Sequence, residues 1–508
     1  MSTKKILAVL LALFVLATAV SGCGNSGSSS ADSQSGSSAT SENSASTEDT
    51  ASTDGEVPTI SLMVVCGTTP PDADAVAEKL SEITREKIGC NVEFITMEIG
   101  NVAQQLNLLL SGGDDTLDVF MAGISVPYST IVNNGQALSL DTLMEPYAEE
   151  VKTALGEKVY ESGRVNGELY GIGRLLDQAS TTCYNLRNDI AEEFGYKNGD
   201  KVDLAELTEL FGKVREKYPD TPLIGPMNGV PSIGDSRIDS LGNKLGVLDN
   251  CGQDTTVTNY YESAGYEELV GYFKQWKEMG CYMADILNVT DAPIDYIPSG
   301  KAFGCFASHF SAEMNGIWSS QNFGTDIASL QIYEDAVAIT PGAYECINPA
   351  TKNPEAAAAL IYLMATDPDV ENLLINGIEG QHYQVLEDNT ATYVDGKDIS
   401  TTGWCLGYSW TALNSTISIP FEYPADYYDR MLAANKNAQQ SKAFGCQFDL
   451  TGVSDAVSAC TNVVNQYENA LSGGAVEDFD ATLAQFQQGL RDAGIDEIVA
   501  AKQEQLDA

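Results

Sequence analysis

The chain has 508 residues, 43% of them hydrophobic, and its 72 acidic residues outnumber the 27 basic ones for a formal net charge of −45. Such an acidic chain is a poor partner for nucleic acid, anionic membrane surfaces and strongly acidic ligands, because like charges repel. The two histidines, His309 and His382, leave few ways to build a histidine-based metal site or a Ser-His-Asp hydrolase. We therefore expect no cofactor.

The N-terminal segment has the pattern of a secretory signal. Two lysines precede an apolar run from Ile6 to Val20, which is shorter than the roughly 20 residues that a membrane-spanning helix needs. Val20-Ser21-Gly22-Cys23 then resembles a bacterial lipobox, in which cleavage precedes the cysteine and its thiol is acylated. We predict a signal peptide over residues 1–22 and a lipid anchor on Cys23 that tethers the protein to the membrane. Ordinary secretion with a chance cysteine is the alternative.

Residues 23–57 are predicted to form a disordered linker. From Gly24 to Ser52 the chain is almost wholly small and polar, so it cannot bury enough apolar surface to offset the entropy lost on ordering. A flexible linker of this kind suits a Gram-positive cell wall, and we expect the protein at the extracellular face of the cytoplasmic membrane. Folded structure should begin near Pro58.

The first folded part alternates strands and helices. Strands are predicted over residues 59–65, 90–97 and 117–121, and helices with apolar positions at helical spacing over residues 73–87 and 102–111. Strands separated by helices are typical of a parallel α/β sheet. Ligands of such sheets bind beyond the carboxyl ends of the strands, which here are residues 67–70 and 123–128.

Neither the cysteines nor the acidic turns form a recognisable metal motif. The ten cysteines besides Cys23 stand singly and often among apolar neighbours, as in Gly304-Cys305-Phe306, so we expect mostly reduced thiols in the core. Asn198-Gly199-Asp200, followed by Asp203, faintly suggests a calcium loop. The ligand order of an EF-hand is missing, which favours a solvated turn before a helix.

Seven passages, taken in chain order, resemble extracellular solute-binding proteins of ABC importers. Leu117-Asp118-Val119-Phe120 after Gly112-Gly113-Asp114 is similar to their "ASGDxPDVF". Gly377-Ile378-Glu379-Gly380-Gln381-His382-Tyr383 is the most specific passage, since "G-I-E-G-x-H-Y" marks the oligosaccharide-binding branch. The other five passages cover residues 165–172, 183–189, 299–304, 353–357 and the tail from 445 to 507. The likeness spans nearly all of residues 58–508.

The resemblance implies a non-catalytic α/β protein with the two-lobed periplasmic-binding-protein-like fold (type II) and a hinge between the lobes. By the family's order, lobe 1 comprises residues 58–172 and 337–385, and lobe 2 comprises residues 173–336 and 386–508. It implies a monomer that captures a carbohydrate, in this branch an oligosaccharide, and delivers it to ABC permease subunits. Two departures stand out: Gly173 replaces the usual proline, and the passage after Trp404 lacks the amides of "W-x-x-G-N-Q".

The resemblance also places candidate ligand contacts at strand ends and in loops without periodicity. We predict that eight residues surround the cleft: Thr68, Gly123, Ser125, Ser308, His309, Tyr344, Trp404 and Trp410. His309 and the two tryptophans would stack on sugar rings, while Thr68, Ser125 and Ser308 would meet hydroxyls. His309 is placed in a loop that follows a strand over residues 303–306. Trp276, at helical spacing, is predicted to be core, and His382 to brace its turn.

Two other functions are compatible with the sequence. A peptide- or signal-binding lipoprotein that feeds a sensor uses the same two-lobed architecture. A carboxylate pair could also make a surface glycosidase, although no acidic residue stands in a recognisable catalytic passage.

Overall fold

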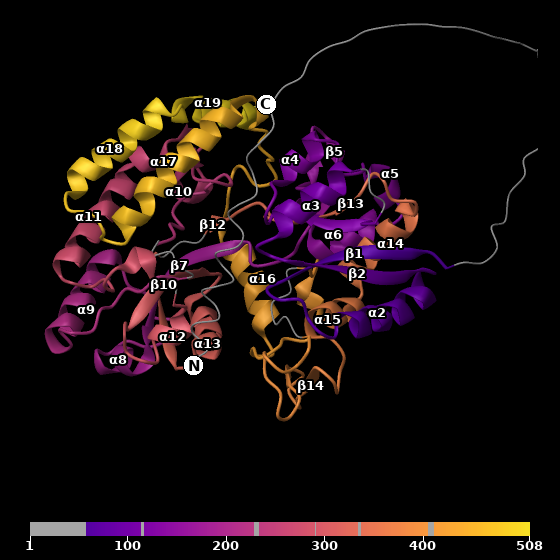
Figure 1. The fold of residues 1–508 in the computed structure, drawn as a ribbon, viewed down its shortest axis with the longest axis horizontal. Coiled ribbons are helices and arrows are strands. Elements are labelled where there is room, and N and C mark those ends of the chain that lie inside the picture. The colour runs from indigo at the N-terminus through magenta and orange to yellow at the C-terminus, as the bar shows by residue number, and fades with distance from the viewer. Residues whose placement is uncertain are drawn as a thin grey trace, which may run out of the picture. The chain divides into compact units, whose positions relative to one another are not determined.

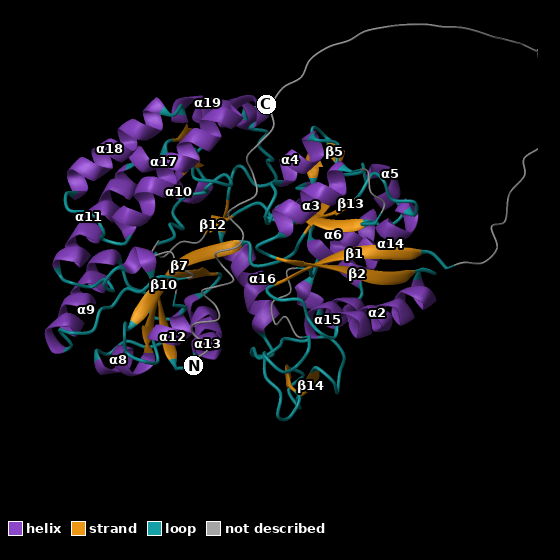
Figure 2. Cartoon of the chain, viewed as in Figure 1, coloured by secondary structure: helices purple, strands orange, loops and turns teal. Residues whose placement is uncertain are grey.

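The computed structural model describes residues 57–112, 116–227, 233–289, 291–333, 337–404 and 411–507. The predicted signal peptide, Cys23 and most of the predicted linker lie outside these ranges, as does Trp410. Residues 56–508 form one compact unit, built on two separate β-sheets with helices packed on them (Figures 1 and 2). Within the described ranges, no helix has both the length and the apolar character needed to cross a membrane.

The first sheet has five strands in the order β2-β1-β3-β13-β6. β1 (Thr59–Cys66) pairs in parallel with β2 (Asn91–Glu98) and β3 (Val119–Ala122), as the alternation of strands and helices predicts. β13 (Tyr344–Ile347) runs antiparallel to both β3 and β6 (Gly171–Gly173). A segment from far along the chain therefore completes this sheet, which is mixed rather than purely parallel.

Helices cover both faces of the first sheet because β1 is apolar on both sides. Successive side chains of a strand point to opposite faces. Leu62 and Val64 pack with α2 (Ala73–Lys87) and α14 (Pro354–Thr366), while Met63 and Val65 pack with α3 (Val102–Ser111). α2 and α3 have the bounds that their apolar spacing predicts. The part of the chain built on this sheet is called the first lobe.

The second sheet has the order β10-β7-β12-β16, and β11 also pairs with β7. Its strands are β7 (Ala179–Arg187), β10 (Gly304–His309), β11 (Ile327–Gln331), β12 (Val337–Ala338) and β16 (Gln439–Gln440). α9 (Leu204–Lys217) and α11 (Ala264–Glu278) pack on it through a core that includes Trp276. Trp276 is fully buried, and its indole N–H donates to Thr208 Oγ1 at 2.8 Å, which confirms it as a core residue. The part built on this sheet is the second lobe.

Three long C-terminal helices pack on the second lobe, where Figure 1 shows them in yellow: α17 (Ser454–Ser472), α18 (Phe479–Asp492) and α19 (Ile495–Leu506). Cys460, Phe486 and Ile498 bury their side chains in the core that also contains Trp276. Helical residues three and four apart share a face, so each helix presents one apolar side to this core.

Shorter elements complete both lobes. In the first lobe they are α4 (Tyr128–Asn133), α5 (Asp141–Met144), α6 (Ala148–Leu155), α7 (Glu157–Glu161), β4 (Arg164–Val165), β5 (Glu168–Leu169), α15 (Pro368–Asn376), β14 (Tyr383–Val385), β15 (Ala391–Tyr393) and η4 (Ser415–Ile417). In the second lobe they are α8 (Asn188–Glu193), β8 (Val247–Leu248), α10 (Asp249–Gly252), β9 (Val257–Thr258), η2 (Tyr260–Glu262), η3 (Ile286–Asn288), α12 (Pro293–Tyr296), α13 (Ala312–Phe323), α16 (Tyr427–Asn437) and η5 (Thr451–Val453).

Three described segments connect the two sheets, and they lie against one another. Arg174 N donates to Ala343 O at 3.2 Å, and Leu175 N donates to Leu413 O at 2.9 Å. The sheets also correct the predicted lobe boundaries. β12 belongs to the second sheet rather than to the first lobe, whereas Trp404 and Leu413, predicted for the second lobe, pack in the core of the first. The physical reason is that the segment after α15 stays against the apolar face of that helix before it crosses.

A buried charge cluster lies beside these crossings. The Arg174 side chain donates to Ala412 O, and Glu371 accepts from Leu413 N at 2.9 Å. Both oxygens of Glu345 and the second oxygen of Glu371 find no hydrogen-bond partner among the described residues. Burial raises the pKa of each glutamate to about 8, against a smaller lowering by the charge of Arg174. Both carboxyl groups are therefore largely protonated at neutral pH.

Replacing Glu345 by Gln should make the free energy of unfolding less dependent on pH. The pKa of Glu345 is raised from 4.5 to about 8 in the folded state. Between these pH values the unfolded chain loses this proton and the folded chain keeps it, so the contribution of Glu345 to the free energy of unfolding falls as the pH rises from 4.5 to 8. This fall amounts to at most about 1.4 kcal/mol per pH unit. Gln keeps the shape of the protonated acid but does not titrate, so it removes this pH-dependent fall in the free energy of unfolding. Urea unfolding across this range tests it, with Glu355→Gln, an exposed glutamate, as the control. Equal slopes for wild type and Glu345→Gln would contradict it.

The cysteines of the described chain form no disulfide. Eight of these nine side chains are buried, and Cys446 is half-buried, which confirms the expectation of core thiols. Burial raises the pKa of several of them, including Cys183 and Cys305, to about 12.

We expect thiol titration to separate the folded from the unfolded protein. A thiol reagent should react with few sulfhydryls in native protein, because only the thiolate reacts and buried thiols keep their protons. After unfolding in denaturant without reductant, at least nine thiols per chain should react. A count well below nine would show that disulfides form.

Candidate ligand-binding site

Four of the predicted contacts lie at one edge of the first sheet. β1 and β3 are parallel, so Thr68 and the residues 123–125 follow strand ends at the same edge, and Tyr344 pairs with Ala122 there. Thr68 is exposed and Ser125 half-buried. Gly123 has φ +108°, and a Cβ at this position would overlap the carbonyl oxygen of Gly342. Only glycine fits here, because the backbone conformation disfavours other residues.

Tyr344 and Trp404 are core residues, which corrects the prediction that they face a ligand. Tyr344 is 1% exposed, stacks on Tyr128 with 4.1 Å between ring centres, and accepts from Gln447 Nε2 at 2.7 Å. Trp404 is 3% exposed, and its indole donates to Leu374 O at 3.3 Å. Neither ring offers a free face. Trp410 lies outside the described residues.

Ser308 and His309 lie at an edge of the second sheet. They are the last residues of β10, paired with Thr182 and Thr181, so the predicted loop begins later than expected. Ser308 is exposed and His309 half-buried. Burial lowers the pKa of His309 to about 4, and its Nδ1 has no hydrogen-bond partner in the described part of the chain. His309 is thus a neutral ring whose Nδ1 is buried without a hydrogen-bond partner among the described residues.

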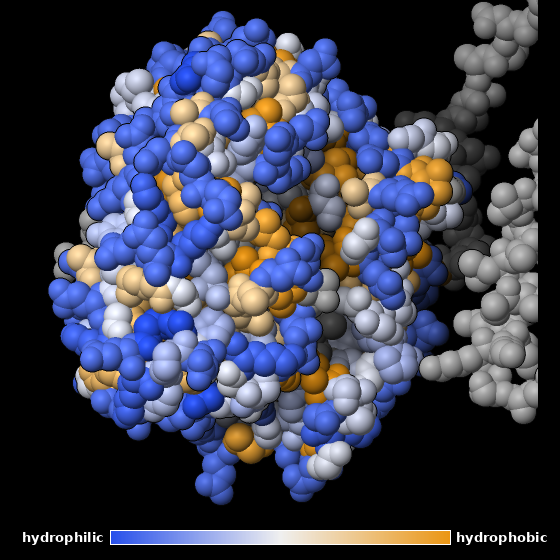
Figure 3. All heavy atoms as spheres, turned by 60° about the vertical axis from the view of Figure 1, so that its left-hand side comes forward, coloured by the Kyte–Doolittle hydropathy of each residue, from blue (hydrophilic) through white to orange (hydrophobic). Residues whose placement is uncertain are grey.

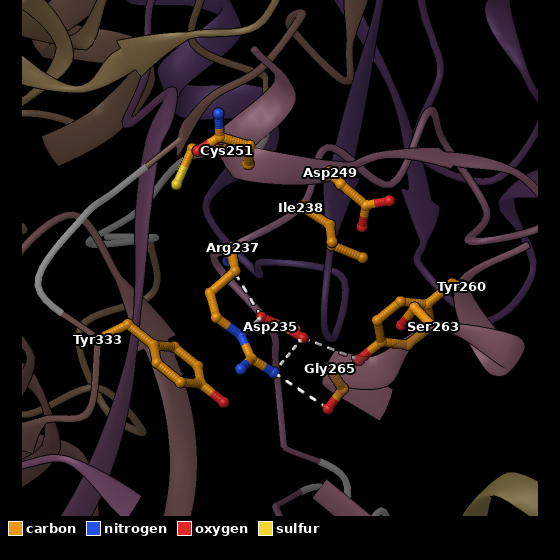
Figure 4. Close-up of a pocket in the computed structure, with 10 residues that line it drawn as sticks. Asp235, Arg237, Ile238, Asp249, Cys251, Tyr260, Ser263, Gly265 and Tyr333 are labelled. Carbon is orange, nitrogen blue, oxygen red and sulfur yellow. Dashed lines mark hydrogen bonds and ion pairs between the residues drawn. The ribbon is translucent and has the colours of Figure 1, made fainter. Parts of the chain in front are cut away.

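A cavity of about 430 Å³ lies on the second lobe near this edge. Thr182 Oγ1 donates to Gly234 O at 3.1 Å and accepts from Ser236 N at 3.2 Å, which holds the loop that carries Asp235 and Arg237 against β7. The lining side chains converge from several loops (Figure 4): Asp235, Arg237, Ile238, Asp249, Asn250, Cys251, Tyr260, Ser263, Gly265 and Tyr333.

The arginine of this cavity makes four side-chain hydrogen bonds. Arg237 donates from Nε and Nη2 to the two carboxylate oxygens of Asp235, each at 2.9 Å, and from Nη1 to Glu268 at 3.0 Å. Its guanidinium carbon also lies 4.6 Å from the centre of the Tyr333 ring. Burial alone would lower the pKa of Arg237, but the hydrogen bond and charge of Asp235 raise it. The cation is therefore permanently paired.

Other groups of the cavity can meet a polar ligand. Asp249 is half-buried and accepts from Thr258 Oγ1 at 2.8 Å. The Tyr333 ring is half-buried, and its hydroxyl oxygen is buried without a partner in the part of the chain that the structure describes. A neighbouring cavity of about 490 Å³ shares Asp249, Ser263 and Gly265. Figure 3 shows a hollow on the face turned to the viewer, with apolar side chains gathered beside it.

No motif marks these lining residues in the sequence. They come from stretches around 235–238, 249–251, 260–265 and 333, and only the fold brings them together. The nearest signal is Asp235-Ser236-Arg237, an acid and a base two apart, which is far too common to point to a site.

Two expectations about individual motifs are confirmed. Asp203 Oδ1 accepts from Glu206 N at 2.7 Å and caps α9, so the 198–206 segment is a turn before a helix. His382 accepts from Ile378 N at 2.8 Å and, through Nε2, contacts Asp72 Oδ2 at 3.0 Å, which braces its turn against the first lobe. In the described ranges, no group of three His, Cys, Asp or Glu residues could hold a metal ion.

Comparison with known sequences gives two matches. The sequence model of a family described as "Domain of unknown function (DUF3502)" matches residues 442–508. A carbohydrate ABC transporter substrate-binding protein of Streptococcus pneumoniae is 22% identical over 471 residues, which cover 90% of this chain and 92% of that protein.

Solved structures match over most of the chain. The N-glycan transport solute binding protein NgtS from Streptococcus pneumoniae superposes with a TM-score of 0.74 at 20% identity, covering 89% of this chain and 98% of NgtS. A solute-binding protein from Bifidobacterium longum infantis, described as binding HMO, gives 0.60 at 15% identity, with 89% and 98% covered. This chain therefore has the two-lobed α/β fold of ABC-transporter solute-binding proteins.

Proposed function

We propose that this protein binds an extracellular oligosaccharide between its lobes and delivers it to the permease subunits of an ABC importer. The observation that carries the proposal is the second-lobe cavity, where an aromatic ring, a hydroxyl and a carboxylate lie together, and where Arg237, the one cation among the described lining residues, is paired with Asp235. NgtS, which has the same fold, is described in complex with Man1GlcNAc and with Man5GlcNAc. A lipid anchor on Cys23 would keep the protein at the extracellular face of the cytoplasmic membrane. The protein would act as a monomer.

The chemistry of the cavity suits a sugar. Sugars present apolar ring faces and rings of hydroxyls, which proteins meet with aromatic side chains and planar polar groups. Tyr333 supplies a half-buried ring, Asp249 supplies acceptor oxygens, and Ser263 supplies a hydroxyl. Ser308 and His309 extend this polar surface along the sheet edge, and Thr68 and Ser125 would meet the ligand from the first lobe.

The charge of the cavity favours a neutral ligand. Asp235, Arg237 and Asp249 together carry a formal charge of −1. The Arg237 guanidinium donates hydrogen bonds to Asp235, Glu268 and Gly265 O. A uronate or sialate would face the Asp249 carboxylate, and the one cation among the described lining residues, Arg237, is already paired with Asp235. Like charges at short range in a partly buried site repel.

The same contacts argue against a glycosidase. Asp235 accepts from both the Arg237 guanidinium and the Tyr260 hydroxyl at 3.1 Å, so it lacks the freedom of an acid that must give and take a proton. Among the described residues that line this cavity, Asp249 is the other carboxylate, and a retaining or inverting mechanism needs two working carboxyl groups.

We expect a thermal-shift screen to show stabilisation by neutral oligosaccharides. At 100 times the dissociation constant, a ligand that binds only the folded state adds about 2.7 kcal/mol. Man5GlcNAc and kestose serve as neutral probes, an alginate oligosaccharide as the acidic probe, and a hexapeptide as the test of the peptide-binding alternative. Stabilisation by the peptide alone would overturn the proposal. Release of reducing sugar from a probe would show an enzyme instead.

Asp249→Asn should weaken binding of a neutral oligosaccharide about tenfold, because a charge-assisted hydrogen bond to a hydroxyl becomes a neutral one. The control is Asp254→Asn, which removes the same charge from an exposed residue five positions on, outside the cavity. Isothermal titration measures both. If the two variants bind as wild type does, the cavity is not the sugar site.

A further inference from the structure

We infer that the C-terminal segment, residues 442–508, positions one wall of the second-lobe cavity, and that Lys502 and Gln503 are its positioning residues. The inference gives a role to the segment that matches a domain of unknown function. It rests on the proposed function only in treating this cavity as the ligand site.

The wall in question is the stretch from Ile238 to Asn259. It contains the β8–β9 hairpin and α10 between its strands. Ile238, Asp249, Asn250 and Cys251 line the first cavity, and Asp249, Thr258 and Asn259 line the second.

The backbone of this wall needs external support. Asn250 and Cys251 have φ of 53° and 52°, in the left-handed region that residues with a Cβ rarely adopt. Successive residues held there cost free energy, and such a conformation persists only where surrounding structure fixes it. Cys251 N donates to Arg237 O at 2.6 Å, which fixes the inner side of the turn. The outer side faces the C-terminal segment.

Lys502 on α19 fixes the start of the wall. Its side chain is fully buried, and Nζ donates to Leu241 O at 3.0 Å, to Asn243 Oδ1 at 2.8 Å and to Gly246 O at 3.1 Å. Burial lowers the pKa of this amino group to about 7, against a smaller raising by the charge of Asp239. In its protonated form an ammonium has three N–H donors, one for each of these three acceptors in a single loop.

Gln503 fixes the end of the wall. Its Oε1 accepts from Val257 N at 2.7 Å, and its Nε2 donates to Thr255 O at 3.0 Å. Val257 also packs with Val499 and Leu506 of α19 in one apolar cluster. Two adjacent residues of one helix therefore hold both ends of the hairpin that carries Asp249.

The same C-terminal segment touches the first lobe. Gln447 Nε2 donates to the Tyr344 hydroxyl at 2.7 Å, and Ser129 Oγ donates to Phe448 O at 3.1 Å. Residues 442–508 thus contact the edge of the first sheet at one end and the cavity wall of the second lobe at the other.

The chain offers a matched pair of variants, Gln503→Ala and Gln505→Ala. Gln505 lies on the same helix and also makes a two-point amide contact, with Asp449 N at 2.7 Å and Asp449 O at 2.8 Å. That contact stays within the C-terminal segment. Both variants lose comparable hydrogen bonds, but only Gln503→Ala releases the wall. Both are made in the full-length chain.

We expect Gln503→Ala to bind Man5GlcNAc about tenfold more weakly than wild type, from the loss of two neutral hydrogen bonds that hold the wall. Gln505→Ala should bind it as wild type does, although both variants melt at similarly lowered temperatures. Hydrogen–deuterium exchange, measured without sugar, should rise across residues 247–259 in Gln503→Ala alone. Gln503→Glu, which keeps the acceptor for Val257 N, should restore part of the affinity.

Equal exchange in the two variants across residues 247–259 would overturn the positioning role. So would faster exchange there in Gln503→Ala with unchanged sugar affinity. If wild type binds none of the neutral probes, the proposed function fails, while the exchange experiment still decides whether the segment holds the wall.

Discussion

The arrangement of the whole unit depends on the place where three chain segments cross between the sheets. The Arg174 backbone donates to Ala343 O and its guanidinium to Ala412 O, while the next residue, Leu175, donates to Leu413 O. Farther along the same crossing, the Asn435 amide donates to Leu176 O at 2.8 Å. One short stretch of chain is thus bonded to both other crossings. Any rotation of one lobe against the other must bend all three together.

This constraint limits where a hinge can lie. Glycine at position 173, where the family that the sequence resembles usually has proline, predicts a more flexible first crossing. In the structure Gly173 is buried within β6, and a Cβ there would lie 2.8 Å from Val159 O. Glycine is therefore required by close packing, and it sits inside a sheet rather than at a pivot. Bending falls to the residues after Arg174, which leave the first sheet.

Most of the fold follows from local patterns in the sequence. The alternation of apolar strands and amphipathic helices predicts β1, α2, β2, α3 and β3 to within two residues at each end, because strand and helix periods differ clearly. The pairing of β13 and β6 with that sheet does not follow, since antiparallel additions come from distant segments without a local signal. The predicted lobe boundary at residue 385 is wrong because a contact between distant segments also has no local signal. Trp404 packs on Phe94 and so belongs to the core of the first lobe.

The candidate site is the least predictable part. Strand ends are visible in sequence, so Thr68, Ser125, Ser308 and His309 fall at sheet edges as expected. Exposure is not visible, and a large aromatic in a Gly/Ser-rich stretch looks available whether or not it is buried. Trp404 is the clear example, since it is 3% exposed and stacked on Phe94. The Asp235–Arg237–Tyr333 group depends on two segments that are far apart in the sequence and meet only in the folded chain, so no local spacing predicts it.

Because no pair of described cysteines is cross-linked, these sulfurs are coupled to the rest of the chain through packing and through weak thiol hydrogen bonds, such as that from Cys460 Sγ to Leu490 O. Evolution can therefore exchange these positions one at a time for alanine, valine or serine, with no second change needed to rescue a lost partner. Among the described cysteines, no disulfide has to be formed or reshuffled for the native state to be reached. Oxidants such as peroxide reach the eight buried sulfurs only during transient opening, whereas the half-buried Cys446 is the described thiol most open to them.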